Sequence, residues 1–264
     1  MSHQRRLCNF IYKGEERLIG LEIFLKSKKD SFIPIGDIER VLSSFNSKIR
    51  HIECSSCKEG ETLVFIIVKV EADDMKLDKL VDALKKDLRD VSKVQLSPSV
   101  WNQFIFSRDL FPLMVGENRA AILDNVFLES MITGARESLG EDLAASLAYH
   151  LGVLAGREGF ERYYLGKNLA DVDEVFRFSD AILGSYGWGR ILEYEFKNDA
   201  LIIRIEKLFE CEVLKDKVDK PASSFFRGLM EGFASKYFGT SVVVKETKCI
   251  AVGDPYCEFV ISII

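Results

Sequence analysis

The chain has 264 residues, of which 47% are hydrophobic and 29% charged, and its formal net charge is -5. This length suits two ordinary domains or one large one, and the composition is typical of a globular protein rather than a disordered or fibrous one. The negative charge argues against a nucleic-acid partner, which needs a basic face to neutralise phosphates.

A membrane location is also not expected. No stretch approaches the eighteen or so uninterrupted apolar residues of a membrane-spanning helix. Residues 1–6 lack the apolar stretch of a signal peptide. We therefore expect a cytoplasmic protein, in which six cysteines are free thiols or metal ligands rather than a disulfide scaffold.

The first part of the chain predicts a ferredoxin-like α/β sandwich. Strand patterns alternate with helical spacing of apolar residues in the order strand, helix, strand, strand, helix, strand. In chain order these elements cover 18–25, 35–45, 48–54, 63–70, a helix that begins at Asp74, and 94–96. The βαββαβ order assigns residues 1–97 to this domain.

A second domain is expected beyond the polar segment Ser97-Pro98-Ser99. We assign 98–117 to a linker with an entry strand and 118–264 to the second domain. Its expected elements are a helix from Asn118 that uses Ile122, Val126 and Met131, a helix over 141–164, a hairpin of 191–196 with 201–208, a helix over 224–238, and strands over 242–250 and 257–263. Helices packed on an antiparallel sheet make this an α+β domain.

The helix over 141–164 has two distinctive features. Its predicted core stripe consists of Leu143, Leu147, Leu151 and Leu154. Beside the stripe, Gly152 and Gly156 lie one turn apart, which costs helix stability but lets another backbone approach closely. Tight packing inside the chain and a subunit contact both account for this pair.

The strongest candidate site is the segment Glu246-x2-Cys249-x7-Cys257, which surrounds a Gly-Asp-Pro turn. Zinc is held by thiolate, imidazole or carboxylate, with four ligands in a structural site. The segment supplies three, and the upstream candidates for the fourth are Cys211, on the strand before the last long helix, and Ser223. A metal site, simple buried thiols and a disulfide remain open as alternatives.

A longer signature surrounds these residues. It comprises Gly228-x3-Gly232, Phe238-Gly239, the strand Val242 to Val244, and Glu246-x2-Cys249-x3-Gly253-Asp254-x2-Cys257. This pattern resembles the C-terminal signature of the 4-vinyl reductase domain, a relative of phenol-responsive sensors and of TRAPP tethering subunits. The resemblance covers Phe111 to Ile264.

The resemblance implies a structural zinc site and an apolar pocket. In the phenol sensors one upstream Cys precedes Glu, Cys and Cys; the last three match Glu246, Cys249 and Cys257. The upstream position falls on Ser223, a poor zinc ligand, so Cys211 is the expected substitute. The implied pocket binds a small apolar or aromatic molecule, and pockets of this kind are mostly apolar. The aromatic residues available to line it are Tyr186, Trp188, Phe209, Phe225 and Phe226.

The first domain resembles ACT-type domains. The βαββαβ order and the segment Pro34-Ile35-Gly36-Asp37-Ile38 carry this resemblance, which implies an interaction module with an amino-acid effector as one role. Another candidate site, His51-x2-Cys54-x2-Cys57, lies at the end of a predicted strand. A redox dithiol is expected at a helix N-terminus, so solvated loop residues are the simpler interpretation.

No catalytic residue is predicted. There is no Gly-x-Gly-x-x-Gly after a strand, no P-loop and no nucleophile elbow. We therefore predict a ligand-responsive regulatory protein, and most simply a homodimer. Its C-terminal domain binds a small hydrophobic molecule, its N-terminal domain serves oligomerisation or a second effector, and its output passes through a protein partner. The alternatives are a TRAPP-like scaffold or assembly factor and an accessory protein of a tetrapyrrole-related reductase.

Overall fold

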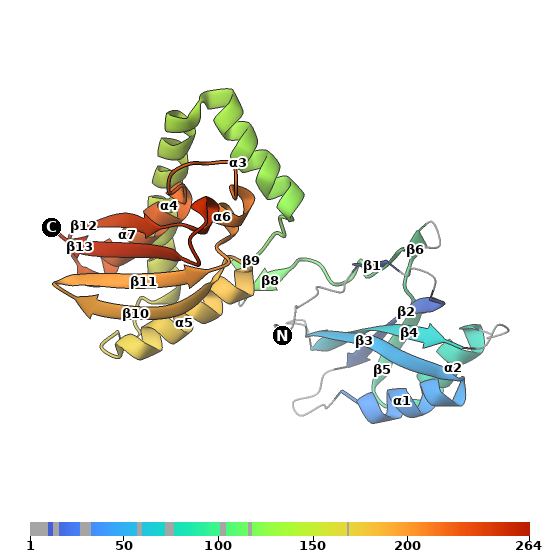
Figure 1. Cartoon of the computed structure of the whole chain (residues 1–264). Coiled ribbons are helices and arrows are strands. Elements are labelled where there is room, and N and C mark those ends of the chain that lie inside the picture. The colour runs from blue at the N-terminus through green and yellow to red at the C-terminus, as the bar shows by residue number, and fades with distance from the viewer. Residues whose placement is uncertain are drawn as a thin grey trace. The chain divides into compact units, whose positions relative to one another are not determined.

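The computed structural model describes residues 10–12, 16–26, 33–56, 60–71, 77–100, 104–115, 118–167 and 169–264 (Figure 1). These residues divide into two compact units, Met1–Ala120 and Ala121–Ile264. Both units combine helices with antiparallel sheets, so the expected α+β class is confirmed. Among the described residues, no helix is both long and apolar enough to cross a bilayer.

The N-terminal unit contains the expected βαββαβ sandwich. Its sheet has the order β3-β4-β2-β5, and every neighbouring pair is antiparallel. The elements are β2 (Leu18–Lys26), α1 (Ile35–Ser44), β3 (Ser47–Ser56), β4 (Glu61–Val70), α2 (Leu77–Asp87) and β5 (Val91–Leu96). The expected helix start at Asp74 lies outside the described residues.

The central strands of this sheet are buried on both faces. On one face Ile23 and Ile66 pack with Ile38 of α1 and Leu80 of α2. On the other face Phe65 and its neighbours are covered by Ile105, which is 1% exposed. Strands buried on both sides read as nearly continuous apolar runs, which is why the run from Leu63 to Val68 is apolar at every position.

The segment expected to be a linker contains short strands. β6 (Ser99–Val100), β7 (Phe104–Phe106) and β1 (Phe10–Tyr12) form a sheet of order β1-β7-β6, while β8 (Met114–Val115) pairs with β9 (Asn118–Arg119). The expected entry strand over Phe111 to Val115 is thus reduced to two residues. Because Ile105 of β7 packs on the main sheet, this segment belongs to the N-terminal unit.

The C-terminal unit is a four-stranded antiparallel sheet of order β10-β11-β13-β12 with helices packed against it (Figure 1). Its helices are α3 (Asn125–Leu139), α4 (Glu141–Tyr163), α5 (Val172–Tyr186), α6 (Phe209–Val213) and α7 (Ser224–Phe238). Its strands are β10 (Arg190–Lys197), β11 (Ala200–Glu206), β12 (Val242–Lys248) and β13 (Cys257–Ile263), with the short 3-10 helix η1 (Ile250–Val252) between β12 and β13. The expected hairpin β10-β11, the helix α7 and the strands β12 and β13 are confirmed.

Helices α4 and α7 pack with their backbones in contact. A Cβ added to Gly156 would lie 2.1 Å from the carbonyl oxygen of Leu229, and one added to Gly228 would lie 2.0 Å from that of Tyr149. Gly152 and Gly232 are equally close to the facing helix. The Gly152 and Gly156 pair therefore serves tight packing within the chain, one of the two alternatives left open by the sequence.

The predicted core stripe of α4 was wrong. Leu143, Leu147, Leu151 and Leu154 are exposed, by 58%, 48%, 52% and 59%. Helical spacing identifies an apolar face but does not say what covers it, and here the glycine-bearing face packs against α7. The apolar residues expected in the preceding helix, Ile122, Val126 and Met131, are likewise exposed. That helix, α3, begins at Asn125 rather than near residue 118, because Asp124 caps it by accepting from the main-chain N–H of Phe127.

Candidate metal centre and ligand cavity

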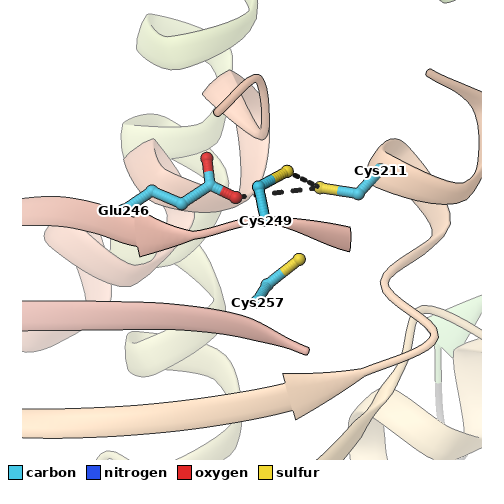
Figure 2. A group of neighbouring side chains, drawn as sticks. All are labelled: Cys211, Glu246, Cys249 and Cys257. Atoms are coloured by element: carbon cyan, nitrogen blue, oxygen red, sulfur yellow. Dashed lines mark hydrogen bonds between the residues drawn. The ribbon is translucent and has the colours of Figure 1, made fainter. Parts of the chain in front are cut away.

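Three cysteines and a glutamate meet at one end of the C-terminal sheet. The thiol sulfurs of Cys211, Cys249 and Cys257 and a carboxylate oxygen of Glu246 all lie within 4.8 Å of one another (Figure 2). The three cysteines are 0% exposed. The sequence named these four residues, and the structure brings all of them together.

Four different elements supply the group. Glu246 comes from β12, Cys257 from the start of β13, and Cys249 from the connection between these strands. The main-chain N–H of Cys249 donates to Oδ2 of Asp254 at 2.8 Å, and Gly253 takes a left-handed φ of 99° that closes the turn. Cys211 lies on the short helix α6 and not, as expected, on a strand.

The distances within the group suit a tetrahedral ion. The Sγ atoms of Cys211 and Cys249 are 3.4 Å apart, and Sγ of Cys211 is 3.8 Å from Oε1 of Glu246. Zinc–sulfur bonds near 2.3 Å in a tetrahedron place two sulfurs about 3.8 Å apart. All three thiols are free, so the disulfide alternative is not found among the described cysteines.

The electrostatics of the group also favour a cation. Hydrogen bonding with Cys211 and Cys257 holds the pKa of Cys249 well below its usual range, and main-chain N–H groups of Ala222 and Ala251 add to this effect. The same hydrogen bonding, followed by burial, raises the pKa of Cys211. Burial, together with the charge of Cys249, raises the pKa of Glu246 to about 8. A divalent cation would favour the deprotonated form of all four groups.

Ser223 contributes through its main chain. Its N–H donates to Oε2 of Glu246 at 3.1 Å, so the residue at the family's upstream cysteine position orients a candidate ligand. Glu210, which the sequence did not single out, accepts from the N–H groups of Phe225 and Phe226 at 3.0 Å each. Burial raises the pKa of Glu210 to about 7. Two buried carboxylates thus satisfy N–H groups at the start of α7.

A cavity of about 360 Å³ lies between the helices and the sheet of the same unit. Its sheet wall consists of aliphatic side chains from β10, β11 and β13, and α7 adds Leu229, Met230, Phe233 and Ala234. Helix α4 contributes Ala155, Gly156 and Gly159. Ligand pockets typically span about 300–1,000 Å³ and are mainly apolar, so this cavity suits a small apolar molecule.

The five aromatic residues expected in the pocket fall into two groups. Tyr186, Trp188 and Phe226 line the cavity. Phe209 and Phe225 are not among its lining residues, and instead their rings lie 5.7 and 5.9 Å from the ring of Trp188. A role for all five in ligand binding stays a prediction.

Hydroxyl groups gather where α4 meets α5. The hydroxyls of Tyr163 and Tyr186 are 2.6 Å apart, and those of Tyr164 and Ser179 are 2.7 Å apart. All four residues line the cavity. The sequence analysis missed α5 and three of these residues; the apolar spacing of Val175, Phe176, Ile182 and Leu183 was the available signal.

The cysteine pair of the N-terminal unit forms no described site. Cys54 is exposed near the end of β3. Cys57 lies outside the described residues. His51 is on the same strand, and within the described part of the chain the one candidate metal group is that of Cys211 and its neighbours.

Comparisons with known proteins place the C-terminal signature in a family. Residues 201–263 match the family model of the 4-vinyl reductase domain, so the resemblance expected from the signature is confirmed for these residues. An uncharacterized protein of Methanocaldococcus jannaschii is 27% identical over 118 residues, which make up 45% of this chain and 64% of that protein. The chain therefore spans less than two thirds of that relative.

Two solved structures are also similar. The phenol-responsive sensory domain of the transcription activator PoxR, solved with phenol, has a TM-score of 0.52 and 18% identity, and the match covers 60% of this chain and 83% of that one. This similarity concerns the fold. The ACT domain from GTP pyrophosphokinase of Chlorobium tepidum is 28% identical with a TM-score of 0.24, and the match covers 31% of this chain and 97% of that domain.

Proposed function

We propose that this chain, whose residues 201–263 match the 4-vinyl reductase domain, is a ligand-responsive regulatory protein that binds a small hydrophobic molecule in its C-terminal unit. The observation that carries the proposal is the cavity of about 360 Å³ between α4, α5, α7 and the sheet. Apolar area removed from water there would contribute roughly 25 cal/mol per Å² to binding. The PoxR sensory domain, which shares the fold, was solved with phenol.

A regulatory role follows from how the cavity is built. Helix α4 contributes Gly156 and Gly159 to the cavity, while its opposite face presents the exposed leucines. A ligand that fits one arrangement of α4 better than another would shift the equilibrium between them. The ACT-like N-terminal unit would serve oligomerisation or a second effector, and a protein partner would receive the signal. The cytoplasmic location expected from the sequence stays a prediction.

We also propose that the group formed by Cys211, Glu246, Cys249 and Cys257 holds a structural zinc ion. Three thiolates and one carboxylate are ligands that zinc accepts, and four protein ligands leave no open position for catalysis. The ion would tie α6 to the β12-β13 connection. A structural role agrees with the expectation that the protein is not an enzyme.

The homodimer expected from the sequence is proposed to form through the exposed apolar residues of α3 and α4. These are Val126, Phe127 and Met131 on α3 and Leu143, Leu147, Leu151 and Leu154 on α4. Large exposed apolar patches on water-soluble surfaces mark interaction sites. A second copy of the same face would cover them, as in isologous dimers.

Thermal shift and native mass spectrometry test the ligand-binding proposal. Apolar and aromatic compounds of one or two rings are expected to raise the melting temperature of the C-terminal unit, because a ligand that binds only the folded state stabilises it. Native spectra should show one ligand for each chain. If no such compound shifts the melting temperature or adds mass, the ligand-binding function is refuted.

A further inference from the structure

The cavity of the C-terminal unit has one polar side. Its sheet wall and its α7 wall are almost entirely aliphatic and aromatic, whereas the α4 and α5 sides carry the hydroxyls of Tyr163, Tyr164, Ser179 and Tyr186. A bound molecule would therefore turn its apolar body toward the sheet and any polar group toward α4 and α5.

The walls of the cavity also differ from an ion-binding site. None of the described residues that line the cavity is an Asp, Glu, Lys, Arg or His. An ion that enters an apolar site loses its hydration, and only an opposite charge or several hydrogen bonds can replace that loss. The walls thus discriminate against carboxylates and amines, and they admit neutral molecules.

The hydrogen bonds of the cavity hydroxyls distinguish them from one another. Ser179 donates its hydrogen to the carbonyl of Val175 at 2.8 Å, so the hydrogen between Tyr164 and Ser179 must come from Tyr164. Tyr237, which also lines the cavity, donates to the carbonyl of Leu169 at 3.2 Å. The hydrogens of Tyr164, Ser179 and Tyr237 are therefore committed within the protein.

Tyr186 is different. Its bond to Tyr163 can take the hydrogen from either hydroxyl, so Tyr186 can turn either its own hydrogen or a lone pair toward a ligand. Burial, followed by the bond to Tyr163, raises the pKa of Tyr186 to about 12. The hydroxyl is therefore neutral at pH 7 and suits a partner that both donates and accepts.

We propose that the ligand is an uncharged molecule with a single hydroxyl on an apolar body, and that Tyr186 is the residue that selects it. The ligand hydroxyl joins the pair of Tyr163 and Tyr186, and its body packs on the sheet and α7. This inference rests on the proposed ligand-binding function and adds the chemical class of the ligand.

The test compares three probes of nearly equal shape by isothermal titration calorimetry at pH 7: naphthalene, 2-naphthol and 2-naphthoate. In the wild-type chain we expect 2-naphthoate to bind at least about a hundredfold more weakly than 2-naphthol. Tyr186→Phe should weaken 2-naphthol about three- to tenfold, the effect of one lost neutral hydrogen bond. The same variant should leave naphthalene affinity unchanged, which also shows that the cavity remains folded.

Tyr237→Phe is the matched control, because it makes the same chemical change in the same cavity at a hydroxyl already committed to Leu169. It should leave the ratio of 2-naphthol to naphthalene affinity at the wild-type value. The inference is overturned if 2-naphthoate binds as tightly as 2-naphthol, or if Tyr186→Phe and Tyr237→Phe behave alike. If naphthalene also fails to bind the wild-type chain, the ligand-binding function itself is wrong.

Discussion

Two glycines three residues apart on α4 should respond in opposite ways to the same substitution. In Gly156→Ala the added Cβ would lie 2.1 Å from the carbonyl oxygen of Leu229 and 2.8 Å from the main-chain nitrogen of Phe233. Both are backbone atoms, which cannot rotate away, so α4 and α7 must separate. In Gly159→Ala the added Cβ meets nothing within 4 Å.

The magnitudes follow from these distances. Overpacking costs about 1–3 kcal/mol, and a clash between two backbones lies at the upper end of this range. Replacing a helical glycine by alanine gives back about 1 kcal/mol. We therefore expect Gly156→Ala to lower the free energy of unfolding of the C-terminal unit by about 2 kcal/mol, and its melting temperature by roughly 6–8 °C. Gly159→Ala should raise the melting temperature by roughly 2–4 °C.

Differential scanning calorimetry of the full chain measures both variants in the same buffer. Gly134→Ala on α3, where a Cβ also meets nothing within 4 Å, reports the propensity effect away from α4. Equal stability of Gly156→Ala and the wild-type chain would refute the backbone contact between α4 and α7. A loss of stability in Gly159→Ala would refute the assignment of open space beside that glycine.

Two further predictions concern the metal group and the exposed leucines. Cys249→Ala and Cys211→Ala should each lose the stoichiometric zinc that metal analysis finds in the wild-type protein, because each removes one of four ligands. Ser223→Ala should keep the zinc, since Ser223 holds Glu246 through its main-chain N–H, and the exposed Cys54→Ala controls for the loss of a thiol; zinc retained in Cys211→Ala would contradict the proposed ligand set. Leu147→Asp with Leu151→Asp should convert a dimer into a monomer in sedimentation equilibrium, with Glu158→Ala on the same helix as control, and an unchanged mass would rule out this face as the dimer contact.

Local patterns were sufficient for several elements. The Asn198-Asp199 turn takes left-handed φ angles of 50° and 58°, and such pairs are typical of tight hairpins, so the β10-β11 hairpin could be predicted. The expected bounds of α7 and β13 agree with the structure. The candidate metal residues could also be named, because the thiols and the carboxylate flank one turn.

Other features depend on contacts that no local pattern encodes. The leucines of α4 have the spacing of a core stripe, yet the chain buries the glycine face instead, because only there can α7 approach. The cavity hydroxyls of Tyr163 and Tyr186 come from the ends of two helices. Their meeting follows from the packing of α4 against α5, not from their spacing in the sequence.

The binding capacity of a chain with a filled cavity tests the central claim most directly. Gly159 lines the cavity, and a side chain added there starts in open space. Gly159→Leu should fold with at least wild-type stability and lose affinity for naphthalene by tenfold or more, whereas Gly134→Leu, the same change outside the cavity, should bind as the wild-type chain does. Undiminished naphthalene binding by a folded Gly159→Leu chain would contradict the claim that this cavity is the ligand site.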